Sequence, residues 1–72
     1  GKGSQTLMLS WNTVAYINDV ESCLSQLCYW VLLAEKADIH YGLEIPDTKI
    51  DPGLGSHHKE HCLEALARYG NQ

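Results

Sequence analysis

The segment from Ile39 to Ile45 constrains the fold most, because its apolar and polar residues alternate strictly. Such alternation is typical of a β-strand with one buried face. The expected buried side carries Ile39, Tyr41, Leu43 and Ile45, and the other side carries His40, Gly42 and Glu44. Pro46 and Asp47 follow and fit the centre of a type I turn, because proline presets φ at the first position. We therefore predict a strand over 39–45 and a short return strand over 48–51 at a sheet edge.

A long helix is predicted upstream, over residues 19–37, with Asn18 or Asp19 as its N-cap. One apolar stripe follows 4, 3, 4, 3 spacing through Val20, Leu24, Leu27, Val31 and Ala34. From Leu27 to Ala34 the helix is apolar nearly all round. A helix of that kind is either buried or presents a surface that awaits a partner.

The remaining elements lie at the two ends of the chain. Residues 6–11 (TLMLSW) form an apolar run of strand length, and residues 12–17 show no clear period and are predicted to be a loop. After a break at Pro52–Gly55, Ser56 is the expected N-cap of a final helix over 56–69, which Gly70 would end.

The element order β-α-β-β-α defines a small α/β fold. A strand, a helix and a second strand form a right-handed parallel crossover, and a hairpin edge strand and a second helix complete the layer. We expect one domain over 6–72 and interpret residues 1–5 as a cloning remnant. Two helices cover a sheet with parallel strands thinly, which indicates a fragment of a larger protein or a dimer.

Charge and hydropathy exclude several classes of partner. The formal net charge is −4 and no basic run occurs, which argues against binding to nucleic acid or to an anionic membrane. The longest apolar run, within 27–34, is too short to cross a membrane, and no signal peptide is recognisable.

The three cysteines are odd in number and fall within helical patterns, so we expect free thiols in a reducing compartment, the cytoplasm. Cys28 lies five residues after Cys23 and points elsewhere on the helix, which argues against a shared metal. Cys23 and Cys62 are expected to be buried.

A histidine cluster opens the final helix, where His57, His58 and His61 share one turn. His57 and His61 lie on one face, but zinc needs three or four ligands, so we interpret the three as capping and surface residues and predict no metal site and no cofactor. The alternative is a small metal-binding or hydrolytic module centred on these three histidines. A nucleophile formed by Cys62 with His58 would lack a third group to orient the imidazole.

The loop before the final helix and the aromatic residues give weaker indications of a binding site. The loop Asp51–Ser56 precedes a helix N-terminus and is either a seat for an anion or a plain connection into the helix. The larger aromatic side chains are expected to pack rather than to form a binding box: Trp11, Tyr29, Trp30, Tyr41 and Tyr69.

Four segments carry a family resemblance: LMLSW, LSQLCYWVLLAE, YGLEIP and IDPGLGSHHKEHCLEALARYG. With them, Leu7 to Tyr69 resembles the C-terminal part of an uncharacterised bacterial family with a von Willebrand A-like domain. Members of that family are often encoded beside AAA+ ATPases and transglutaminase-like proteins, and often have membrane segments near the N-terminus.

The resemblance implies the fold and a role in interaction rather than catalysis. The metal-holding Asp-x-Ser-x-Ser of von Willebrand A domains would fall at Ser10–Val14, where Ser10 replaces the aspartate and Val14 cannot ligate. No catalytic residue is carried over. The implied partner is another protein. It is either the rest of the larger parent protein or an AAA+ ATPase, and the family's membrane segments would anchor the parent protein to a membrane.

The apolar surface also predicts a weak homodimer, which would form through Tyr29–Leu33 or through residues 6–11.

Overall fold

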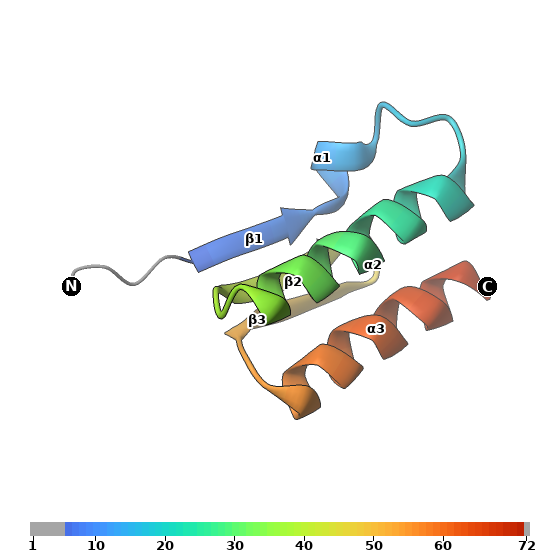
Figure 1. Ribbon diagram of the computed structural model, residues 1–72. Coiled ribbons are helices and arrows are strands. Elements are labelled where there is room, and N and C mark those ends of the chain that lie inside the picture. The colour runs from blue at the N-terminus through green and yellow to red at the C-terminus, as the bar shows by residue number, and fades with distance from the viewer. Residues whose placement is uncertain (1–5, 72) are drawn as a thin grey trace.

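The computed structural model describes residues 6–71 and contains three strands and three helices (Figure 1). In chain order these are β1 (Thr6–Ser10), α1 (Trp11–Val14), α2 (Val20–Lys36), β2 (His40–Ile45), β3 (Thr48–Gly53) and α3 (Ser56–Gly70). The predicted mixed α/β class is confirmed. Residues 1–5, interpreted above as a cloning remnant, lie outside the described residues.

The sheet has the order β1-β2-β3 and is mixed. β1 runs parallel to β2, with Thr6 opposite His40 and Ser10 opposite Glu44, which confirms the parallel connection through α2. β2 pairs antiparallel with β3 across the turn at Pro46 and Asp47, so the hairpin is confirmed too.

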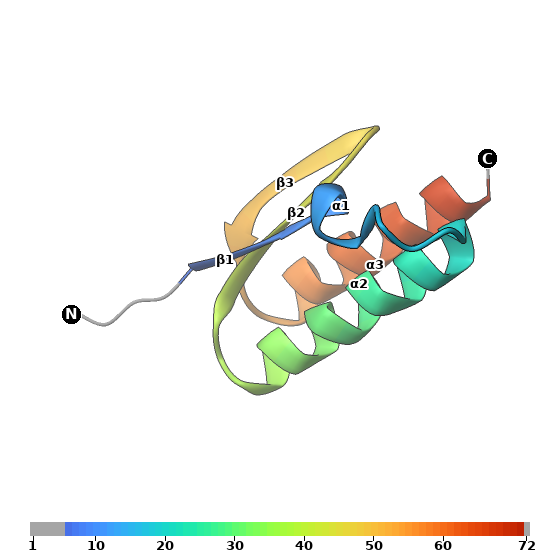
Figure 2. The same ribbon diagram turned by 90° about the horizontal axis from the view of Figure 1, so that it is seen from above.

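The sheet and the long helices form two layers, and α2 and α3 lie side by side on the same sheet face (Figure 2). The alternation in β2 places Tyr41, Leu43 and Ile45 against the helices, as predicted, whereas His40 and Glu44 are exposed. The core between the layers contains Leu9, Val14, Cys23, Leu27, Val31, Ala34, Tyr41, Leu43, Ile45, Ile50, Cys62 and Leu66. Neither α2 nor α3 covers the opposite sheet face.

Helix α2 begins at Asp19, whose carboxylate accepts a hydrogen bond from the Ser22 backbone N–H (3.1 Å). Its end is a Schellman motif, because the Ile39 N–H donates to the Ala34 carbonyl and the Asp38 N–H to the Glu35 carbonyl. Asp38 has φ 62°, the left-handed conformation that this motif requires. The predicted stripe is buried from Leu27 onward but wrong at Val20, which is 52% exposed.

Residues 11–14 form the short helix α1, so the predicted strand to Trp11 and loop over 12–17 are wrong there. The Ser10 hydroxyl accepts a hydrogen bond from the Asn12 N–H (3.2 Å), which ends β1 and caps the new helix. Val14 then points into the core and is fully buried. A helix this short has no apolar period to detect.

The hairpin and the final helix differ from prediction at their junction. β3 continues to Gly53 instead of ending at Asp51, because Pro52 lies at the sheet edge, where its missing N–H costs no ladder bond. Gly55, not Ser56, is the N-cap of α3, and its φ of 107° is open to glycine but not to residues with a Cβ. Gly70 is the last helical residue and Asn71 the C-cap.

Candidate functional site

The histidine cluster does not act as one site, because His58 turns inward while His57 and His61 stay exposed. The His58 imidazole stands edge-on to the Tyr41 ring, with centroids 4.6 Å apart, and its Nε2 contacts the Tyr41 backbone carbonyl. A carbonyl only accepts, so Nε2 carries the proton and donates. His58 also approaches Gly53 so closely that a Cβ there would lie 2.9 Å from Nδ1.

Cys62 lies beside His58 but is poorly suited to nucleophilic chemistry. Its Sγ is 3.7 Å from His58 Nε2, the nitrogen that already donates to Tyr41. Burial, and then the nearby Glu35 carboxylate, raise the pKa of the Cys62 thiol to about 11. At neutral pH the sulfur is therefore protonated and enclosed, which is the state of an unreactive structural cysteine.

The loop before α3, for which an anion seat and a plain connection were both considered, holds a carboxylate of the protein itself. The Gly55 N–H donates to both oxygens of the Glu35 carboxylate, at 3.0 Å and 3.3 Å, and the Tyr41 hydroxyl donates to Oε2 at 2.8 Å. Burial and these contacts with Glu35 raise the pKa of the Tyr41 phenol. Glu35 thus joins the end of α2, β2 and the start of α3.

We name these residues the Glu35 cluster: Glu35, Tyr41, Gly55 and His58. Sequence reasoning missed it because Glu35 falls on the polar side of α2, where periodicity predicts a solvated charge. The signal that was present is the glycine before α3, since an open helix N-terminus attracts a carboxylate. The cluster's polar atoms bond to one another, which fits a structural role.

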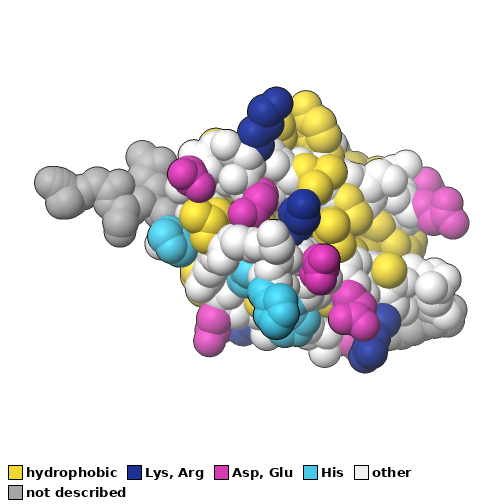
Figure 3. All heavy atoms as spheres, turned by 60° about the horizontal axis from the view of Figure 1, so that its bottom comes forward, with side chains coloured by type: hydrophobic (Ala, Val, Ile, Leu, Met, Phe, Trp, Pro, Cys, Tyr) yellow, Lys and Arg dark blue, Asp and Glu magenta, His cyan; other side chains and the backbone are white. Residues whose placement is uncertain are grey.

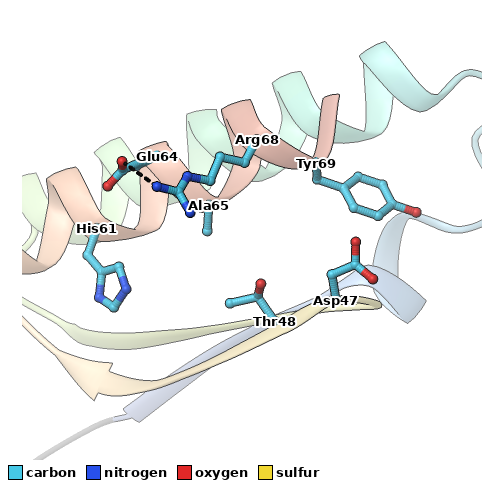
Figure 4. Close-up of a pocket in the computed structure, with 7 residues that line it drawn as sticks. All are labelled: Asp47, Thr48, His61, Glu64, Ala65, Arg68 and Tyr69. Atoms are coloured by element: carbon cyan, nitrogen blue, oxygen red, sulfur yellow. Dashed lines mark hydrogen bonds and ion pairs between the residues drawn. The ribbon is translucent and has the colours of Figure 1, made fainter. Parts of the chain in front are cut away.

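A polar groove of about 420 Å³ lies between α3 and the β2–β3 turn (Figure 4). Within the groove Arg68 turns back along α3, and its Nη2 lies 3.4 Å from Oε2 of Glu64. The Tyr69 ring packs edge-on against Trp11, with ring centroids 5.1 Å apart.

Histidine, acidic and basic side chains lie together on the surface near the start of α3 (Figure 3). In residues 6–71 no three His, Cys, Asp or Glu side chains come together in a way that could hold a metal ion.

The segment that corresponds to the von Willebrand A metal motif is engaged in folding. Ser10 caps α1, and Val14 is buried in the core. The Val14 carbonyl accepts a hydrogen bond from the buried Cys23 thiol (3.2 Å). Ser10 and the Val14 carbonyl thus take part in local hydrogen bonds of the fold.

An open, apolar surface lies at the outer edge of β1. Beside it lies a groove of about 400 Å³. Its lining combines strand, α1 and α2 side chains, none of them charged: Leu7, Met8, Leu9, Thr13, Trp30 and Leu33. Leu7 is 42% exposed, Met8 38% and Leu33 43%. Among the described residues β1 pairs only with β2, so the backbone groups on its other side have no strand partner.

The opposite edge, β3, carries several features that discourage strand addition. Lys49 and Asp51 are exposed there, Pro52 lacks an N–H, and the pairing with β2 shifts register between Tyr41 and Leu43. Charges, proline and bulges are the devices by which proteins protect a sheet edge. β1 has none of the three, since its sequence is TLMLS.

The remaining cysteines and aromatic residues have mixed outcomes. Cys23, Cys28 and Cys62 are free thiols, and Cys23 and Cys62 are buried as predicted. Burial raises the pKa of the half-buried Cys28. Of the five aromatic residues predicted to pack, only Tyr29 does not, since it is 57% exposed on α2.

Comparison with protein-family models, curated proteins and solved structures found no match to this chain. Within residues 6–71 no helix is both long and apolar enough to cross a membrane.

Proposed function

We propose that this chain is a non-catalytic protein-interaction module of von Willebrand A-like architecture, and that it binds its partner along β1. The single observation behind the proposal is that the outer edge of strand β1 is uncharged and borders an apolar groove between β1 and α2. An extended segment that adds to β1 would satisfy the strand's outer N–H and C=O groups and bury the half-exposed leucines beside them. We name this surface the β1 edge: β1 together with Thr13, Trp30 and Leu33.

The architectural part of the proposal has its own support. A parallel crossover followed by an antiparallel edge hairpin agrees with the resemblance to von Willebrand A-like proteins. The partner is then the rest of a parent protein or an AAA+ ATPase. The free thiols favour a reducing compartment, and we place the module in the cytoplasm.

A peptide titration followed by NMR tests the interaction role. The probe is a soluble peptide of five alternating threonine and leucine residues with two lysines at each end. Amide signals of residues 6–10 should shift and become protected from exchange, because added strands pair through the backbone. A peptide with a central proline, which cannot complete the ladder, should leave them unchanged.

Matched variants show whether the peptide uses the β1 edge. Leu33→Glu places a charge in the groove and should abolish the shifts. Leu32→Glu adds the same charge one residue earlier, on the α2–α3 side, where Leu32 is 48% exposed, and should leave them intact. Absence of shifts in β1, or shifts confined to the start of α3, would refute the proposal.

A further inference from the structure

The edge of β1 is suited to one partner whose chemistry is already known, namely β1 itself. An added strand must be extended, uncharged over about five residues, and apolar on the side that faces Trp30 and Leu33. β1 meets each condition, with Leu7 and Leu9 on the helix side and Met8 on the outer side. We infer that two copies of this chain pair antiparallel through β1, an inference that rests on the interaction role proposed above.

Symmetry fixes the direction of this pairing. Two identical edges that meet around a two-fold axis must run antiparallel, so that each strand presents the same groups to the other. With the axis at Met8, Met8 lies opposite Met8 of the second copy, and Leu7 lies opposite the second copy's Leu9. The two three-stranded sheets then join into one, with all the long helices on the same face.

The register also buries the exposed apolar groups on both faces. On the helix side Leu7, Trp30 and Leu33 meet their counterparts, and on the outer side the two Met8 side chains meet above Gly42. Met8 already lies over that glycine, because a Cβ added to Gly42 would come within 3.1 Å of its sulfur. No side chain of β1 or of the groove is charged, so the pairing brings no like charges together among these residues.

The contact is short, so we expect a weak dimer that forms at high micromolar to millimolar concentration. Sedimentation equilibrium of the full chain over that range should show a monomer that converts to a dimer. Leu33→Glu should raise the dissociation constant at least tenfold, and Leu32→Glu should leave it within twofold of the unchanged chain.

Cysteine cross-linking tests the register, in a Cys28→Ser background because Cys28 is the least buried native thiol. Met8→Cys places the two new thiols opposite each other at the axis, within disulfide range, and mild oxidation should yield a covalent dimer. Thr6→Cys is the control, since the two Thr6 positions would lie four residues apart along the strand, about 13 Å. It should remain monomeric under the same oxidation.

The results of these experiments distinguish pairing of two copies through β1 from binding of a different segment. A constant monomer mass up to millimolar protein overturns the pairing of two copies, and the peptide titration then decides separately whether the edge binds another segment. Cross-linking through Thr6→Cys but not Met8→Cys, or a dimer weakened by Leu32→Glu and not by Leu33→Glu, also overturns it. A peptide that binds to a strictly monomeric chain would retain the interaction role and reject the second copy as partner.

Discussion

The two edges of this small sheet differ in character: polar contacts close the β3 side, whereas the β1 side is open and apolar. On the β3 side, the Glu35 cluster joins α2, β2 and α3 through hydrogen bonds that span 6, 17 and 20 residues of sequence. On the β1 side, the sheet ends in an uncharged strand and half-exposed apolar side chains. A single residue of α2, Ala34, separates Leu33 in the open groove from Glu35 in the closed cluster.

This contrast separates residues that hold the fold from residues available for binding. Polar atoms in the Glu35 cluster satisfy one another, so the cluster has little left to offer a ligand. The β1 edge has the reverse character, because its outer backbone groups and apolar side chains gain from contact with another chain. Substitutions on the two sides should therefore affect different properties, stability on one and association on the other.

Removal of the Glu35 carboxylate should have the largest effect on stability. Glu35→Ala leaves the Tyr41 hydroxyl and the Gly55 N–H without their acceptor, and Tyr41 is fully buried. We expect a loss of about 2–4 kcal/mol in the free energy of unfolding, measured with urea. Glu44→Ala removes an exposed carboxylate from β2 and is the control. Equal losses for the two variants would contradict the structural role of the cluster.

Gly55→Ala should have the next largest effect. No heavy atom lies within 4 Å of an added Cβ, so the cost is backbone strain alone, at φ 107° and ψ 169°. We expect a loss of about 1–3 kcal/mol in the free energy of unfolding. The Gly55 amide signal should also move, because relief of the strain draws its N–H away from Glu35. An unchanged stability would mean that the start of α3 adopts another conformation.

Ionisation of Cys62 should give a smaller, pH-dependent effect. Its pKa is about 11 in the folded chain, above the usual value of 9.0, so the unfolded chain loses the proton first as pH rises. The stability is therefore intact below pH 9 and falls as pH rises from 9 towards 11, by about 1 kcal/mol at pH 10. Urea unfolding of Cys62→Ala at pH 7 and pH 10 should lack this component, whereas exposed groups whose pKa does not depend on Cys62 contribute equally to both proteins.

The sequence predicts the elements with clear periods and misses the contacts between them. Alternation located β2, and helical spacing located α2 and α3, because burial of one face imposes those periods. α1 was missed because a helix of four residues shows no apolar period. The prediction ended β3 too early because proline usually ends a strand, although a strand at a sheet edge tolerates Pro52. Periodicity cannot identify the Glu35 cluster, since its bonds join residues far apart in the chain.

The histidines illustrate the same limit at the level of the candidate site. The spacing of His57, His58 and His61 places them on one turn, and the structure confirms that turn. It does not indicate that His58 packs against Tyr41 while the other two remain exposed. By contrast, the prediction of an apolar surface on α2 is confirmed at Leu33, because the other elements within residues 6–71 leave that side of the helix partly exposed.

The smallest expected effect on stability is at Leu33, and it is the sharpest test of the contrast. Leu33→Glu changes a side chain that is already 43% exposed, so at low protein concentration the free energy of unfolding should change by less than about 0.5 kcal/mol. Leu32→Glu corrects for the effect of a negative charge near the C-terminal end of α2. Urea unfolding at micromolar concentration compares both with Glu35→Ala. If Leu33→Glu destabilises the monomer as much as Glu35→Ala does, the β1 edge is part of the core and the distinction between a closed and an open side is wrong.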